Sequence, residues 1–580
     1  MLDPILEAVE RCDATGSPAS STCPELAQCV PSGIKLQDIA AGLDKLSSST
    51  PDAVKSLRII QACLDNLQDG SEGETEDISS PLSEISDYVG RLILPVVPAS
   101  EDSDTEDAAT AARTQFLFKG ELGLNILHTL TSHHASFTLN PPTLLSVVSY
   151  TNPHDPWTSD ASAEIARNLL QSQFSPPPEQ PPPGKKEMTN SRSSKADFIT
   201  DTLLTQHLRP LFSKSRPATV TASGRKAAFV EEPDAAMLED RAAKAWKYTH
   251  VYAVTVFDWA VRAAAVTTTT KQQKKKVDDE VVVPLLAQTW HLFTPVLLTL
   301  LDESETALKV RALGIFGAFW SGCPPGLMDQ VGLASVFEDA VFPAVHFLPN
   351  ITPEDESRLI LNAAYPALFQ LAGLTTDRDA TTATTNSNEE VKTATLTTAQ
   401  RKLLDRIIRE GILTGYFHAK DHIKLTVVFC EKLAYAVNGM GILSVKYLKD
   451  ILPMISEVMT NPFGTKHPQS VLSATQLLQA ILRCCWPRIS GYQTEIVRIL
   501  TVCWLNIADE DTWPTTDEAA PTRSELESQL AKAAELLASI MRNNAQEDQD
   551  EPSVTLAELV VPLIKKEPLL ASLFPIELVK

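Results

Sequence analysis

The sequence lacks the short motifs on which most enzymes depend. It contains no Cys-x-x-Cys pair, no Gly-x-x-x-x-Gly-Lys phosphate loop, no Gly-x-Ser-x-Gly nucleophile elbow and no set of kinase motifs. Carboxylates are abundant, but most are expected in loops or on solvated helix faces, so no pair can be nominated for acid–base catalysis. We therefore predict a protein that is not an enzyme, with no catalytic residue, no metal ion and no cofactor.

Basic side chains are in short supply as well. The 50 Lys and Arg residues are outnumbered by 73 Asp and Glu, for a formal net charge of −23, which argues against nucleic acid or an anionic membrane as a partner. The one basic run, Lys271–Lys276, is followed at once by three acids. It indicates a solvated loop, with a weak nuclear-import signal as the alternative.

The compartment is indicated by two further absences. The first residues, Met-Leu-Asp-Pro-Ile-Leu-Glu, carry acids where a secretory signal needs positive charge. The nine cysteines follow no disulfide spacing, which is typical of a reducing compartment. We expect the protein in the cytoplasm and the nucleus.

Two apparent site motifs are better explained as helix ends. His418 and His422 have a spacing found in zinc sites, but Asp421 looks like a helix cap between them and no third ligand is evident. Gly439-Met440-Gly441 resembles the start of a dinucleotide loop, yet it follows a helix instead of a strand. We predict that Asn438 and Gly439 form a left-handed helix stop.

Helical periodicity runs from end to end, and no convincing strand alternation interrupts it. Around Pro295 and again around Pro343, an apolar helix containing proline is followed by a polar turn and a second helix, and Pro453 repeats the interior-proline pattern. This arrangement is typical of HEAT-type repeats, which stack because a single pair cannot bury its apolar face. The predicted fold is an all-α solenoid of degenerate HEAT-type repeats with disordered loop insertions.

Several local features refine this prediction. The uncharged run Val281–Leu301 is long enough to cross a bilayer, but its polar residues and prolines favour the buried first helix of a repeat. The turn from Asp302 to Val310 is longer than an ordinary HEAT turn. Thr352 is expected to cap a helix whose first position is Pro353.

Composition divides the chain. Ser175–Lys195 is rich in Pro, Ser and Lys, and Thr375–Thr398 is rich in Thr, Asn and Glu, so neither stretch buries enough apolar surface to offset the entropy of ordering. We predict an N-terminal helical region at 1–174, a linker at 175–195, and a C-terminal solenoid at 196–580 with a disordered loop at 375–398.

One helix end carries an aromatic residue beside a proline and an arginine. A helix is expected to end at Trp486, because Pro487 cannot continue it, with Arg488 beyond the end. The favoured interpretation makes Trp486 a core residue that closes one helix pair on the next. In the alternative, Arg488 is presented on a ridge that a partner uses.

An acidic tract at Ser103–Asp107 offers candidate phosphorylation sites. Ser103 and Thr105 are surrounded by carboxylates, as acid-directed kinases prefer, and a phosphate there would be able to dock a cluster of arginines. An unmodified, solvated loop is the favoured explanation, because acidic loops are common.

Four ordered segments together resemble one family, the Tel-two-interacting protein two family of the TTT co-chaperone complex. They are Pro295–Glu303 with the following Lys309-Val-Arg, then Ile351–Glu354, Gly441–Leu448, and Val471–Ile489. Each alone is weak, but their order and spacing are fairly specific, and they cover about Val282 to Ile507. The segments at 175–195 and 375–398 look like insertions, as in filamentous-fungal members.

The resemblance implies a scaffold that joins the Tel-two protein and a larger HEAT-repeat Tti subunit. With the ninety-kilodalton heat-shock chaperone, it would help phosphatidylinositol-3-kinase-like kinases mature, which act in nutrient and DNA-damage signalling. The candidate partner-binding residues lie where the family's segments concentrate: Gly441, Ile442, Lys446, Tyr447, Trp486, Pro487 and Arg488. We expect negative charge around them to steer a basic partner. A nuclear transport receptor or another protein-binding adaptor is the alternative.

Overall fold

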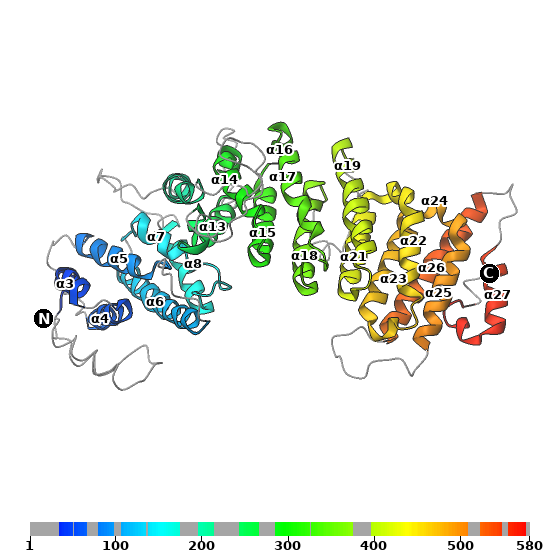
Figure 1. The fold of residues 1–580 in the computed structure, drawn as a ribbon, viewed down its shortest axis with the longest axis horizontal. Helices are drawn as coiled ribbons and strands as arrows, with labels where there is room; N and C mark the ends of the chain where they lie inside the picture. The colour runs from blue at the N-terminus through cyan, green and yellow to red at the C-terminus, as the bar shows by residue number, and fades with distance from the viewer. Residues whose placement is uncertain are drawn as a thin grey trace, which may run out of the picture. The chain divides into compact units, whose positions relative to one another are not determined.

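The computed structural model is helical, and no β-strand occurs among the residues it describes. These are residues 34–49, 52–66, 79–97, 106–134, 137–174, 195–213, 243–265, 285–324, 326–374, 396–508, 523–547 and 555–575. The chain divides into two compact units, one of residues 1–299 with 322–324 and one of residues 300–321 with 325–580. Figure 1 shows antiparallel helices following one another in each, which confirms the all-α solenoid class.

The N-terminal unit is built from amphipathic helices whose apolar faces form its core. Its elements are α3 (Leu36–Ser49), α4 (Ala53–Asp65), α5 (Ser79–Ile93), α6 (Glu106–His133), α7 (Pro141–Val148), α8 (Asp160–Phe174), α9 (Lys195–Asp197), the π-helix η1 (Phe198–Leu208), α10 (Arg209–Phe212), α12 (Ala245–Tyr248) and α13 (Ala253–Ala265). Helix α14 (Leu285–Leu301) begins in this unit. The predicted helix at Leu2–Arg11 lies outside the described residues.

Helices on both sides of the Pro-rich segment pack together in the N-terminal unit. The ring of Phe174, at the end of α8, lies 5.6 Å from the ring of Phe198 and 6.2 Å from that of Trp259. Helix α7 also contacts η1 and α13. The two compact units divide at residue 300, and the predicted boundary at 175–195 falls within the first of them. The segment itself lies outside the described residues, because only its last residue, Lys195, is placed.

A buried tyrosine joins two histidines in this unit. The hydroxyl of Tyr252 lies 3.1 Å from Nε2 of His207 and 3.2 Å from Nδ1 of His250. Burial, with a smaller contribution from the nearby His250, lowers the pKa of His207 to about 4. Both histidines are therefore neutral near neutral pH, since burial also lowers the pKa of His250.

The C-terminal unit consists of successive helix pairs. Its elements are α15 (Thr306–Gly322), α16 (Leu327–Gln330), α17 (Leu333–Val341), η2 (Phe342–His346), α18 (Glu354–Leu371), α19 (Thr398–Arg406), the π-helix η4 (Ile407–Leu413), α20 (Thr414–Ala419), α21 (Ile423–Met440), η5 (Gly441–Tyr447), α22 (Leu448–Met459), η6 (Gly464–Lys466), α23 (Pro468–Cys484), α24 (Trp486–Ile489), η7 (Ser490–Tyr492), α25 (Gln493–Ala508), α26 (Arg523–Glu547), α27 (Leu556–Lys566) and η9 (Pro568–Ala571). The second helices α18, α21, α23 and α26 stack in that order.

This stacking gives the C-terminal unit two edges made of helix ends. The turns inside the pairs, at residues 347–353, 420–422 and 460–467, lie along the lower edge in Figure 1, which we call the intra-pair edge. The connections between pairs, including η5 and α24, lie along the upper edge, the inter-pair edge. The two edges are separated by the length of a helix.

The first repeat turn is tied by a buried lysine. Lys309 is 4% exposed, and its Nζ donates a hydrogen bond to the carbonyl of Leu301, one of the last carbonyls of α14. Helix α15 begins at Thr306, so the turn is shorter than the sequence predicted. An interior Pro295 is found in α14 as expected. Within the Lys309-Val-Arg segment, the lysine is thus the residue that connects α15 to the end of α14.

The next repeat departs from the predicted boundaries. Pro343 lies in the 3-10 segment η2, directly after α17 ends at Val341, because proline cannot continue the α-helical hydrogen bonding. Pro353, and not Thr352, occupies the N-cap of α18, without a side-chain cap. Thr352 instead uses its carbonyl to accept a hydrogen bond from Ser357.

One apolar stretch, Ile423–Met459, has the length and hydropathy of a membrane span. It is not one continuous helix, because Gly441 with φ +56° ends α21 before η5 and α22 begin. Most of its apolar residues are buried in the interior of the solenoid, where α21 and α22 both pack against α23. Their hydropathy is that of core helices, and α14, the helix of the predicted uncharged run, likewise buries Phe293 and Leu297.

Candidate functional site

A carboxylate on α19 holds η5 in place on the inter-pair edge. Asp405 accepts hydrogen bonds from the hydroxyl of Tyr447 at 2.5 Å, from Nζ of Lys446 at 2.7 Å and from Nε of Arg409 at 3.3 Å. Partial burial opposes ionisation, but these three donors outweigh it and lower the pKa of Asp405 to about 2. Asp405 therefore remains charged, and the edge is preorganised around it.

This arrangement separates the roles of the predicted η5 residues. Tyr447 is fully buried, so it supports the edge and offers no free surface. Ile442 is 52% exposed, and its neighbour Leu443, which sequence reasoning missed, is 39% exposed. Lys446 is exposed but paired with Asp405. Gly441, not Asn438 or Gly439, adopts the positive φ that ends α21, so the predicted stop is displaced by two residues.

The favoured interpretation of Trp486 is wrong. Trp486 is 44% exposed. Helix α23 has already ended at Cys484, and Trp486 begins the separate short helix α24, with Pro487 in its first turn. Pro487 and Arg488 are exposed too, whereas Ile489 is buried. Arg488 is exposed beside Trp486, as the alternative interpretation requires, and its use by a partner stays a prediction.

The inter-pair edge is cationic. Arg401 and Lys402 begin α19, Lys449 begins α22, and Arg483 and Arg488 flank the α23–α24 connection. All five are exposed, and none forms an ion pair within the described part of the chain. Unpaired cations beside exposed apolar side chains are suited to a partner with carboxylates and apolar groups.

The net charge around this surface is opposite in sign to the expected charge. Residues 396–508 contain 13 Lys and Arg against 7 Asp and Glu, a formal net charge of +6 in a chain of net charge −23. The expectation that negative charge around this surface steers a basic partner is therefore wrong. Total charge is dominated by other parts of the chain, and only the local balance acts within a Debye length of about 8 Å.

Arg406 connects α19 to the preceding helix pair. Its Nη1 lies 2.8 Å from a carboxylate oxygen of Glu338 on α17, and its guanidinium carbon lies 3.8 Å from the ring centroid of Phe342. The adjacent Asp405 contacts the following pair through η5. Two consecutive residues of α19 thus connect three successive pairs.

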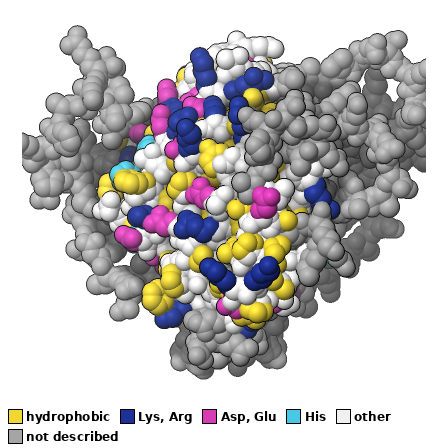
Figure 2. Space-filling view, turned by 90° about the vertical axis from the view of Figure 1, so that its right-hand side faces the viewer, with side chains coloured by type: hydrophobic (Ala, Val, Ile, Leu, Met, Phe, Trp, Pro, Cys, Tyr) yellow, Lys and Arg dark blue, Asp and Glu magenta, His cyan; other side chains and the backbone are white. Residues whose placement is uncertain are grey.

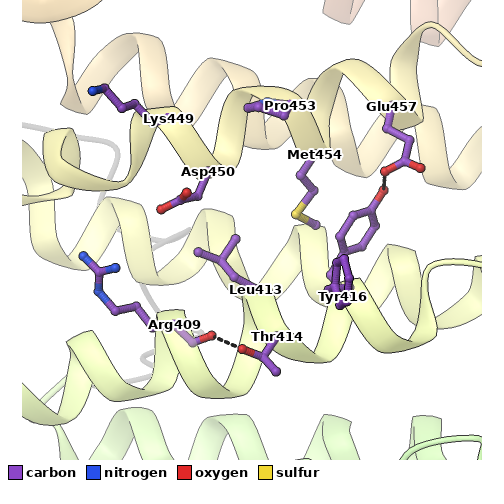
Figure 3. Close-up of a pocket in the computed structure, with 10 residues that line it drawn as sticks. Arg409, Leu413, Thr414, Tyr416, Lys449, Asp450, Pro453, Met454 and Glu457 are labelled. Carbon is purple, nitrogen blue, oxygen red and sulfur yellow. Dashed lines mark hydrogen bonds between the residues drawn. The ribbon is translucent and has the colours of Figure 1, made fainter.

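A groove opens between the η4–α20 segment and α22. Its volume is about 600 Å³. Figure 3 shows Leu413 and Met454 pointing toward each other across it, with Arg409, Lys449 and Asp450 at one end and Tyr416 and Glu457 at the other. The other lining residues are Thr414, Phe417 and Pro453. Sequence reasoning missed this groove, since its walls come from two segments about 40 residues apart.

The intra-pair edge carries exposed apolar residues at three successive turns. Ile351 is 90% exposed, Phe417 is 71% exposed and Phe463 is 66% exposed. Two ion pairs lie near them, Lys424 with Asp355 at 2.8 Å and Lys420 with Glu457 at 2.7 Å. This edge lacks the cationic surplus of the other edge.

The end of the C-terminal unit offers a third surface. Figure 2 shows hydrophobic side chains in patches between Lys and Arg on this face. In its described part, Val561 of α27 is 41% exposed and Leu569 of η9 is 55% exposed, close in sequence to the exposed Lys565 and Lys566.

The remaining predicted sites lie as follows. His418 is in α20, whereas His422 is the N-cap of α21, where its Nδ1 lies 3.4 Å from a carboxylate oxygen of Glu354. His422, and not Asp421, therefore occupies the cap position between the two helices. Among the described residues, no cluster of three metal ligands occurs. Ser103 and Thr105 lie outside the described residues.

The comparisons with known proteins complete these observations. The model of the Tti2 family matches residues 143–466, which is 324 of the 580 residues. The chain belongs to the Tti2 family. Membership supports a role as a component of the TTT complex and agrees with a scaffold-type protein. The comparison with curated proteins found no match.

The family match covers only part of the inter-pair edge. It begins in α7, well before the region where the sequence resemblance was found, and it ends at Lys466 in η6. The Asp405 cluster, η5 and the groove of Figure 3 lie inside the matched residues, whereas α24 lies outside them.

Proposed function

We propose that the chain is a non-catalytic scaffold subunit of the TTT complex that holds the Tel-two protein and the larger HEAT-repeat Tti subunit. Family membership supports this role, and stacked helix pairs provide the extended surfaces that such scaffolds use. Acting with the ninety-kilodalton heat-shock chaperone, the complex would support the maturation and stability of phosphatidylinositol-3-kinase-like kinases. The proposed locations are the cytoplasm and the nucleus.

The inter-pair edge is the proposed contact for the larger Tti subunit. The observation that carries this placement is the exposure of Ile442 and Trp486 on an edge that also carries the exposed, unpaired Arg488. Large apolar side chains and arginines are the residue types that dominate binding energy in protein interfaces. A cationic rim would speed association with an acidic partner surface.

The test is a pull-down of the larger Tti subunit by the full chain. The double variant Ile442→Asp, Arg488→Glu should no longer bind the larger Tti subunit. The first change buries a carboxylate in the contact, and the second places a negative charge against an acidic partner surface. The double variant Phe463→Asp, Lys466→Glu, at the intra-pair edge, is the matched control and should retain it. Equal binding by both variants would refute the placement of the contact on this edge.

A second measurement addresses the cellular role. Depletion of the protein should lower the abundance of the kinases without lowering their messenger RNA, because a maturation factor acts on the newly made chain. Unchanged kinase abundance would contradict the proposed function, whatever the outcome of the pull-down. Imaging of the tagged protein tests the proposed location.

A further inference from the structure

The groove of Figure 3 has apolar walls but polar ends. Leu413 and Pro453 line it with exposed or half-exposed apolar surface, and Met454, which faces Leu413 across the groove, is only 3% exposed. Phe417 leaves 71% of its surface exposed at the same groove. An exposed aromatic side chain of this kind provides surface against which an inserted apolar group can pack.

The two ends of the groove differ electrostatically. At the end near the intra-pair edge, Glu457 is satisfied by Lys420 at 2.7 Å and by the hydroxyl of Tyr416 at 3.0 Å. At the end near the inter-pair edge, Lys449 forms no ion pair among the described residues, although its neighbour Asp450 also lines the groove.

The residues around this second end leave a positive balance. Arg409 and Lys446 share Asp405, and Asp450 offsets one further cation. Arg401 and Lys402 add two more exposed cations, one helical turn before Asp405 on α19. A carboxylate is therefore favoured at this end, while the other end is already neutralised within the chain.

The dimensions match a short helix. Arg409 and Phe417 are eight residues apart on one wall, which corresponds to about 12 Å at roughly 1.5 Å per residue, or about two helical turns. A helix of that length presents apolar side chains at i, i+3, i+4 and i+7 along one face, and carboxylates are favoured at its N-terminus.

We propose that this groove binds a short amphipathic helix of a partner protein, with its acidic N-terminal end at Lys449 and Arg409 and its apolar face along Leu413, Pro453 and Phe417. The inference goes beyond the proposed function, because the groove is distinct from the η5–α24 surface assigned to the larger Tti subunit. The scaffold therefore has a second docking site, specific for acidic apolar segments.

The test measures binding of a fluorescein-labelled peptide to the purified full chain by anisotropy. The probe is a helical peptide of about fourteen residues with two N-terminal aspartates and leucines at i, i+3, i+4 and i+7 spacing. Phe417→Ala should weaken binding by roughly fivefold or more, as expected for an aromatic contact. Lys449→Glu should weaken it by a similar factor at low salt and by less at high salt.

Matched controls come from the neighbouring turn. Phe463→Ala and Lys466→Glu change the same residue types at similarly exposed positions that do not line the groove, so both should bind the probe like the parent chain. All four substitutions are at exposed positions, and equal melting temperatures will confirm that each variant is folded. A second probe with lysines in place of the aspartates should bind at least tenfold more weakly.

The proposal would be overturned by no binding of the acidic probe, by equal loss in the groove and control variants, or by equal binding of the lysine probe. Displacement of the probe by an RNA oligonucleotide would assign the cations to nucleic acid instead. The larger Tti subunit is added in a separate arm. Its binding to Phe417→Ala distinguishes failure of the groove from failure of the proposed function, which concerns Ile442 and Arg488.

Discussion

The hydroxyl of Tyr447 donates a hydrogen bond to the carboxylate of Asp405 across 2.5 Å, and this contact joins η5 to α19. The ring of Tyr447 is buried, while Lys446 and Arg409 complete the set of donors. A single carboxylate thus fixes a loop whose exposed neighbours, Ile442 and Leu443, form part of the candidate partner surface.

Replacing Asp405 with Asn should lower the free energy of unfolding of the C-terminal unit at pH 7 by about 1–2 kcal/mol, an estimate reduced for the exposure of the pair. Because the pKa is about 2 in the folded chain and 3.8 ordinarily, the contribution is complete above pH 4 and is lost as the pH falls from 4 towards 2. Urea unfolding at pH 7 and pH 3 measures this. Tyr447→Phe, which removes one donor, should lose less, and a pH-independent difference for Asp405→Asn would contradict the electrostatic explanation.

Trp486→Ala should change the melting temperature little, with a cost under about 1 kcal/mol, because surface truncations away from special features are small. Trp504 is the comparison: it is 9% exposed, and its Nε1 donates to the carbonyl of Leu569 at 3.1 Å. Trp504→Ala should cost about 3–5 kcal/mol. Chemical denaturation of both variants measures the two losses in the free energy of unfolding. Equal losses would show that Trp486 is a core residue after all.

Acidification should weaken the N-terminal unit through His207. Its pKa is lowered to about 4 from 6.5, so the neutral form contributes stability that is complete above pH 6.5 and is lost as the pH falls towards 4. The loss is at most about 1.4 kcal/mol per pH unit within that window. His207→Gln should flatten this part of the stability profile. An unchanged profile, measured by thermal melts between pH 7 and 5, would remove His207 as its cause.

A fragment that begins at Ala196 should be less stable in its first helices than the full chain. It lacks Phe174, whose ring packs against Phe198 and Trp259, and it lacks the contacts of α7 with η1 and α13. Hydrogen exchange of residues 198–212 should therefore be faster in the fragment than in the full chain, while exchange in α21 and α23 is unchanged. Equal protection of residues 198–212 would support the boundary predicted at 175–195.

Much of the fold follows from the sequence, because apolar periodicity and capping are local signals. The helices around Pro295 and Pro453 hold their interior prolines where the pattern places them. The displaced boundaries at Pro343 and Pro353 are shifts of a few residues at helix ends, which local propensity specifies weakly.

Less of the candidate site could be predicted from the sequence. Proline after Trp486 indicated a helix end, but the same residue also suits the first turn of a new helix, and only the path of the chain shows which applies. Phe417 and Lys449 are 32 residues apart, so their shared groove depends on how the pairs stack. The cationic patch was present in the sequence, and a count over residues 396–508 would have found it.

The two consecutive residues Asp405 and Arg406 determine where α19 sits. One is bound by donors of the next pair and the other binds Glu338 of the previous pair, so sliding the helix by one residue would place each charge against the wrong neighbour. The position of α19 is thus determined by its own residues, and not by the length of the segment that precedes it. A change in the length of the segment at 375–395 would therefore cost only loop-closure entropy, which grows with the logarithm of the length.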